Sequence, residues 1–139
     1  MNLYEFKSLQ VNFFERSVKI NGEDVQIVAK MYDLFEYLIR NKEIILSKNT
    51  LFNRVWGFES ETTFSVVEVY ISKLRKLLEK GELAGQLLTI KNAGYCWTEK
   101  DTSALQTFKF IKIHSKILVI TPQNRLDYGK QLFISEIAG

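Results

Sequence analysis

Residues 63–80 read TFSVVEVYISKLRKLLEK, and this stretch decides the fold. Its apolar residues follow the alternating four- and three-residue spacing of one helix face, namely Val67, Ile71, Leu74 and Leu78. The opposite face carries two lysines, two hydroxyl side chains and one valine, but no acid: Ser65, Val69, Ser72, Lys73 and Lys76. The stretch therefore predicts an amphipathic helix whose outer face is basic.

A hairpin is predicted directly behind this helix, because residues 87–91 and 95–98 can form strands around a turn at residues 92–94. In front of it, residues 29–41 and 47–57 carry helical spacing; Ser47 is a candidate N-cap and Gly57 a C-terminal stop.

Residues 2–28 alternate apolar and polar side chains, and Asn21-Gly22 favours a type I′ hairpin turn. The predicted order is an antiparallel sheet, three helices and a hairpin. That is the α+β plan of a winged helix-turn-helix, whose third helix enters the major groove.

Composition restricts the function classes. The chain has 139 residues and 46% hydrophobic content, which predicts one domain of ordinary size with a small addition. A net charge of +3 is too small to indicate nucleic acid by itself. The N-terminal residues do not resemble a signal peptide, and no apolar stretch is long enough to span a membrane. We therefore expect a cytoplasmic protein that contacts no membrane.

The sequence predicts neither an enzyme nor a metal or cofactor site. One cysteine, Cys96, cannot form an internal disulfide, and with one histidine, His114, it cannot build a zinc site. No glycine-rich phosphate loop occurs, and the carboxylates are scattered singly. Cys96 is expected to be a small strand residue rather than a redox sensor, since no neighbouring Cys or His would activate it.

Three motifs resemble the effector domain of OmpR/PhoB-type response regulators: NRVWG at 53–57, VEVYISKLRK at 67–76 and TIKNAGY at 89–95. Residues 65–70 are most similar to the CiaR branch of this bacterial family. The resemblance covers residues 1–100. It implies a DNA-binding domain that regulates transcription in a two-component system, with the receiver domain absent from this chain.

The resemblance also implies roles for individual residues. Val69, Ser72, Lys73 and Lys76 match groove-facing positions, and Arg75 and the Trp56 indole N–H match phosphate contacts. Thr89, Lys91 and Tyr95 match wing positions that touch the backbone or minor groove. The implied partners are double-stranded DNA with promoter direct repeats, a second copy in a homodimer, and RNA polymerase at loop 58–62.

The chain departs from the family pattern at several positions. Ser65 replaces a usual arginine, which predicts the loss of one phosphate contact, and Lys91-Asn92 replaces a common Arg-Gly. Asn92 tolerates the left-handed conformation, so the turn is expected to survive. Lysine reads the minor groove less well than arginine does, and Cys96 also replaces an arginine. These changes predict modest affinity.

Ordinary explanations compete with these roles. Lysines on an outer helix face are usually just solvated, whereas Val69 there is well placed for a thymine methyl. The Trp56 ring is expected to be largely packed, and Tyr95 could brace the wing instead of touching DNA. A winged-helix protein-interaction module and a degenerate effector remain the alternatives.

The tail, residues 101–139, matches nothing in the family. Its alternation over residues 108–119 predicts a strand, followed by a turn at Thr121-Pro122 and a short segment to Ile137. The tail is interpreted either as a dimerisation or docking β-hairpin or as a non-native extension without an evolved function.

Overall fold

The computed structural model describes residues 2–57, 60–102, 110–113, 116–119 and 125–126. The chain divides into two compact units. The first comprises Met1–Arg40 and Asn49–Ala84, and the second comprises Asn41–Lys48 and Gly85–Gly139. Each unit is described by itself.

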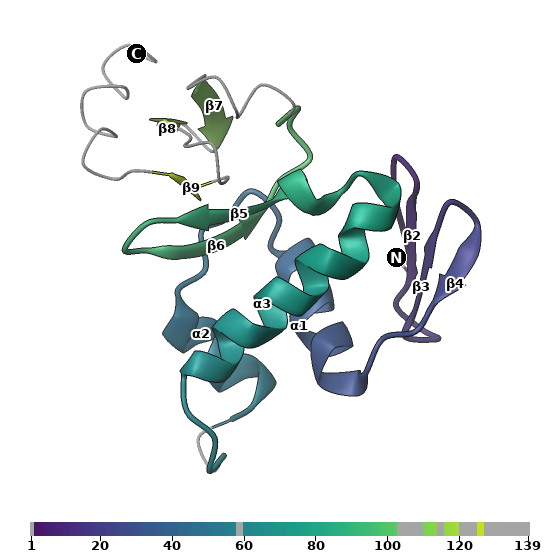
Figure 1. Ribbon diagram of the computed structural model, residues 1–139, viewed down its shortest axis with the longest axis horizontal. Coiled ribbons are helices and arrows are strands. Elements are labelled where there is room, and N and C mark those ends of the chain that lie inside the picture. Colours follow the sequence, from purple (N-terminus) through teal and green to yellow (C-terminus); the bar gives the residue numbers. More distant parts are fainter. Residues whose placement is uncertain (1, 58–59, 103–109, 114–115, 120–124, 127–139) are drawn as a thin grey trace. The chain divides into compact units, whose positions relative to one another are not determined.

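The first unit begins with an antiparallel sheet in the order β1-β2-β3-β4 (Figure 1). Its strands are β1 (Leu3–Phe6), β2 (Leu9–Asn12), β3 (Ser17–Ile20) and β4 (Glu23–Val25). Asn21 and Gly22 between β3 and β4 both have positive φ, 55° and 79°, as a type I′ turn requires. The predicted hairpin at Asn21-Gly22 is thereby confirmed.

Three helices follow: α1 (Ala29–Arg40), α2 (Lys48–Val55) and α3 (Ser65–Leu78). A 3-10 turn, η1 (Glu79–Gly81), extends α3. The helix predicted over residues 63–80 is thus present but starts at Ser65, and Phe64 occupies its N-cap position without a side-chain capping bond. The predicted α-helix overreaches by two residues at its end because the last turn tightens to 3-10 geometry, as helix ends often do.

The core of the first unit is built from the apolar stripes of the sheet and of the helices. The buried sheet residues are Leu9, Val11, Val18 and Ile20, and the buried residues of α3 are Val67, Ile71, Leu74 and Leu78. Two side chains of the sheet region also hold the end of α3. The Ser8 hydroxyl donates to the Gly81 carbonyl at 3.2 Å, and the Asn21 amide donates to the Lys80 carbonyl at 3.2 Å.

In the second unit, β5 (Leu87–Ile90) follows the 3-10 turn η2 (Ala84–Gln86) and pairs antiparallel with β6 (Gly94–Trp97). Asn92 in the connecting turn has φ 65°, so it adopts the left-handed conformation expected for it. The predicted hairpin is therefore confirmed. On its other edge β5 pairs in parallel with β9 (Arg125–Leu126).

The tail contains β7 (Phe110–Ile113) and β8 (Lys116–Val119), which pair antiparallel. The single strand expected over residues 108–119 is wrong, since residues 110–113 and 116–119 form two strands that pair with each other. No glycine or proline lies between residues 110 and 119, so the sequence pattern could not divide this stretch into two strands. The turn expected at Thr121-Pro122 lies outside the described residues, and of the segment to Ile137 only Arg125–Leu126 is described.

Candidate nucleic-acid interface

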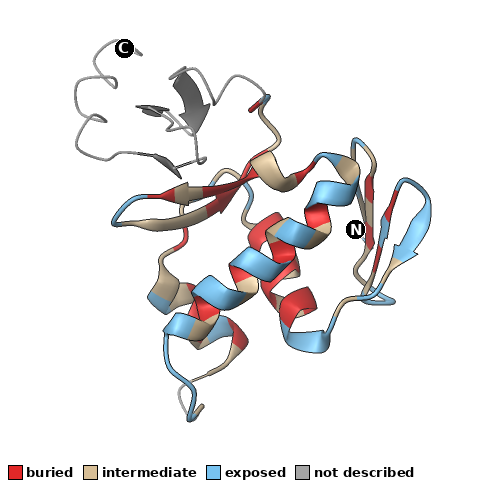
Figure 2. Cartoon of the chain, viewed as in Figure 1, coloured by how far each residue is buried: buried red, intermediate tan, exposed pale blue. Residues whose placement is uncertain are grey.

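The outer face of α3 is open to solvent. All five residues predicted for this face are exposed: Ser65, Val69, Ser72, Lys73 and Lys76. Exposed positions recur along α3 in Figure 2, and the apolar stripe on the other side of the helix is buried. This separation follows from the 3.6-residue period of the sequence, so the helix presents a continuous polar and basic strip.

Val69 is the apolar exception on this strip, with 48% of its surface exposed. Isolated exposed apolar residues are common, but this one has a lysine, Lys73, one turn further along the same face. The nearby acid Glu68 is also exposed, yet it projects from the flank, as does the half-buried Arg75. The strip thus combines positive charge with one methyl-bearing contact.

Trp56 lies just beyond the end of α2 and is half-buried. Its ring stacks on Phe52, with centroids 6.0 Å apart and planes at 15°. Tyr70 of α3 meets it edge to face, with centroids 5.2 Å apart and planes at 84°. The expectation that this ring packs against neighbours agrees with these contacts, while the phosphate contact of its N–H stays a prediction.

Ser65 opens α3, and its hydroxyl lies 2.6 Å from the hydroxyl of Thr63. Phe64 between them is 45% exposed and packs edge to face on Phe52, with centroids 4.7 Å apart. The start of α3 is therefore held by an aromatic contact instead of a side-chain cap. Part of the loop before it, residues 58–59, lies outside the described residues.

The three wing residues lie on the hairpin of the second unit. Thr89 and Tyr95 are direct partners in the β5–β6 register, so their side chains share one face, and Lys91 is exposed at the turn. Tyr95 also exchanges two backbone hydrogen bonds with Leu46, of 2.8 and 2.9 Å. The backbone of Tyr95 thus braces the hairpin. Whether its side chain also braces the wing or touches DNA stays a prediction.

Gly94 is required where β6 begins. Its φ is 151°, and a Cβ built there would collide with the backbone carbonyl oxygen of Leu46. Only a residue without a side chain permits this close approach.

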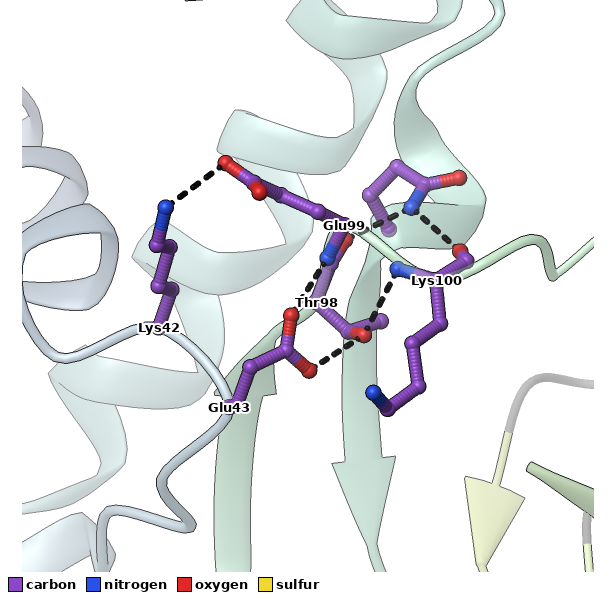
Figure 3. A network of polar contacts seen from close by, with 6 residues as sticks. Lys42, Glu43, Thr98, Glu99 and Lys100 are labelled. Atoms are coloured by element: carbon purple, nitrogen blue, oxygen red, sulfur yellow. Dashed lines mark hydrogen bonds and ion pairs between the residues drawn. The ribbon is translucent and has the colours of Figure 1, made fainter. Parts of the chain in front are cut away.

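A polar network fixes the chain just after β6 (Figure 3). The Glu43 carboxylate accepts hydrogen bonds from the Thr98 hydroxyl at 2.6 Å and the Glu99 N–H at 2.8 Å. Lys42 forms an ion pair with Glu99 at 3.1 Å. The sequence does not predict this network, because its members carry no motif and are brought together only by the fold.

Cys96 lies on β6 and is fully buried. Burial raises the pKa of its thiol to about 12, and the nearby Glu43 carboxylate adds to the shift. The thiolate is therefore strongly disfavoured, which agrees with the expected role of a packed strand residue.

A family model described as "Transcriptional regulatory protein, C terminal" matches residues 22–97. The chain belongs to this family. The Transcriptional regulatory protein CiaR of Streptococcus pneumoniae is 40% identical over 94 residues, which cover 68% of this chain and 42% of that protein. The chain thus spans less than half the length of this relative.

Solved structures of the same kind match the fold. The effector domain of BfmR from Acinetobacter baumannii is 31% identical, covers 71% of this chain and 92% of that one, and has a TM-score of 0.59. The DNA-binding domain of Klebsiella pneumoniae RstA, solved in complex with the RstA box, is 24% identical, covers 72% of this chain and 100% of that one, and has a TM-score of 0.61. The predicted OmpR/PhoB resemblance and winged-helix fold are confirmed.

The described residues lack two kinds of feature. No cluster of three or more His, Cys, Asp or Glu side chains suited to a metal ion occurs there. No helix in that part of the chain is long and apolar enough to cross a membrane.

Proposed function

We propose that this chain binds promoter DNA sequence-specifically and regulates transcription, as the effector domain of a two-component response regulator. The main support for this proposal is the outer strip of α3, which is exposed along the helix, basic and free of acids. In a family of transcriptional regulators, such a strip suits the major groove, which admits an α-helix. No catalytic role is assigned to the domain.

The residues divide into two tasks. Val69, Ser72 and Lys73 read base edges, where Val69 meets a thymine methyl and Lys73 meets an acceptor such as guanine O6 or N7. Phosphate contacts come from Arg75, Lys76, Lys91 and the Trp56 N–H, and they set the position of the domain on the duplex. Thr89 and Tyr95 add wing contacts to the backbone or minor groove, and Ser65 supplies a hydroxyl where the family pattern has an arginine.

Assembly and location follow as part of the same proposal. Two copies occupy direct repeats as a homodimer on DNA, and the loop over residues 58–62 contacts RNA polymerase. The protein acts in the cytoplasm, where the promoter lies. The RstA DNA-binding domain, which has this fold, was solved with its own DNA box, and this supports the choice of ligand.

Selection of bound duplexes from a random pool tests the proposal directly. We expect one half-site, repeated in the same orientation, to be enriched. Binding to that site should fall steeply with salt, because phosphate contacts release counterions, and Lys91→Ala should lower the salt slope by about 1.

The same experiment tests the alternative, a protein-interaction module. The exposed Phe64 and Val69 favour that alternative, because apolar side chains on a basic strip also suit a protein partner. Two results together would contradict the DNA proposal. The pool would yield no preferred duplex, and the chain would instead bind a protein with an affinity that does not change with salt.

A further inference from the structure

An aromatic series links the start of α3 to a lysine on its outer strip. Phe64 contacts Phe52, Phe52 stacks on Trp56, and Trp56 meets Tyr70. The Lys73 ammonium then lies over the Tyr70 ring, 5.5 Å from its centroid. The series passes through Phe52, a buried residue of α2, and reaches solvent at Lys73.

The contact between Tyr70 and Lys73 follows from helix geometry. Residues three apart lie about 60° apart around the axis, which makes them neighbours on the helix surface. An ammonium group within about 6 Å of an aromatic centroid is attracted by the ring face. Tyr70 is half-buried and held edge to face by Trp56, so its ring offers the lysine a fixed support.

The other lysine of the strip provides an internal comparison. Lys76 is exposed on the same helix, and in the described part of the chain no aromatic ring lies beneath it. A free lysine keeps its rotamer freedom until it binds, and that freedom is lost on contact with a base. A contact with the Tyr70 ring would restrict the Lys73 side chain before DNA arrives, and Lys76 has no such contact to restrict it.

We propose that Tyr70 is a positioning residue that orients the Lys73 ammonium for base recognition, and that the ring of Trp56 supports Tyr70 in this role. This inference rests on the proposed function, because it assigns a cause to the specificity of the same strip. Tyr70 acts through its ring, and its hydroxyl is not required. A base contact from a preoriented lysine favours the correct duplex over others, since only the correct duplex presents an acceptor in that place.

The test compares Tyr70→Leu and Tyr70→Phe with the unchanged protein, on the selected duplex and on a scrambled one. Tyr70→Leu should reduce the ratio of the two affinities about two- to fivefold, the range expected for a surface cation–π contact. Tyr70→Phe should keep the ratio, because a phenyl ring also supports the ammonium. If the leucine variant is unfolded by circular dichroism, Tyr70→Gln replaces it.

Double variants separate positioning from general damage. In a Lys73→Ala background, Tyr70→Leu should not reduce the affinity ratio any further. In a Lys76→Ala background, Tyr70→Leu should reduce the ratio by the same factor as it does in the otherwise unchanged protein. An equal loss in both backgrounds would overturn the proposal. A loss with Tyr70→Phe as large as with Tyr70→Leu would also overturn it, because that result assigns the effect to the hydroxyl.

A measurement without DNA keeps this proposal distinct from the proposed function. In the free protein, the Lys73 side-chain methylene signals nearest the ammonium should be shifted upfield by the ring, and Tyr70→Leu should abolish the shift. Absence of the shift in the unchanged protein overturns the positioning role and leaves DNA binding intact. Failure of the unchanged protein to prefer any duplex overturns both.

Discussion

Lys73 lies in the middle of the exposed strip of α3, one turn beyond Val69. Replacement by alanine removes the proposed base contact but leaves the apolar side of the helix untouched. We expect Lys73→Ala to weaken binding to the selected duplex by about 1–3 kcal/mol and to relax the preference at one base position. Titration of matched and single-mismatch duplexes measures both effects.

Lys80 is the matched control for Lys73. It is also exposed, but it lies in η1 beyond the end of α3. Lys80→Ala should leave the sequence preference unchanged. If Lys73→Ala weakened every duplex equally, Lys73 would be a phosphate contact and its assignment as a base reader would be wrong.

The burial of Cys96 predicts how the stability of the protein changes at alkaline pH. The buried thiol has a pKa of about 12, whereas in the unfolded chain it ionises near its ordinary value of 9.0. Above that ordinary value the unfolded state gains stability by releasing the proton, so the free energy of unfolding should fall as pH rises from about 9 toward 12. Urea denaturation at about pH 8 and pH 9.5 measures the fall.

The control for this prediction is Cys96→Ala, which should show a smaller fall over the same interval. Its absolute stability is lower because of the cavity, so the comparison concerns only the change with pH. Burial also raises the pKa of Tyr32 above its ordinary value of 10.0, and the lower pH interval limits its contribution. An equal fall in both proteins would show that another group is responsible.

At the scale of elements, Gln86 holds the chain that leaves β6. Its side-chain amide donates to the carbonyls of Thr98 and Lys100, at 2.6 and 2.9 Å, and its oxygen accepts from the Thr102 hydroxyl at 3.1 Å. Gln86→Ala would leave these groups unpaired in a largely buried place. We expect it to lower the free energy of unfolding by about 1–3 kcal/mol.

Chemical denaturation of Gln86→Ala beside Gln26→Ala tests this prediction. Gln26 is exposed, so its replacement should change stability by no more than about 0.5 kcal/mol. Equal stability of the two variants would mean that water replaces the Gln86 contacts.

The contrast between α3 and Gln86 shows what the sequence could predict. The strip and the buried stripe of α3 follow from periodicity, and the Asn21-Gly22 turn follows from local backbone preference, so both were predictable residue by residue. The bonds of Gln86 and Glu43 join residues far apart in the chain, and no local pattern encodes them. Tyr70 was overlooked for a related reason, since its importance comes from the ring of Trp56, which lies just beyond the end of α2.

At the scale of the whole molecule, the question is where the DNA-binding domain ends. The sequence resemblance places the boundary at residue 100, and this stays a prediction. The hydrogen bond between Thr102 and Gln86 ties two further residues to the hairpin unit. Beyond them, β9 adds two paired residues to β5 through Thr89 and Ile90.

Two truncated chains distinguish the contributions of these segments. Removal of residues 103–139 keeps the Thr102 bond, and removal of residues 101–139 deletes it. Both should bind the selected duplex as tightly as the full chain, because every residue proposed to contact DNA lies before residue 100. The shorter chain should be less stable by about 1 kcal/mol, the net value of one hydrogen bond. Weaker DNA binding or loss of a dimer in both truncations would instead show that the tail takes part in function, and the β5–β9 pairing would then be the first contact to test, since Thr89 belongs to it.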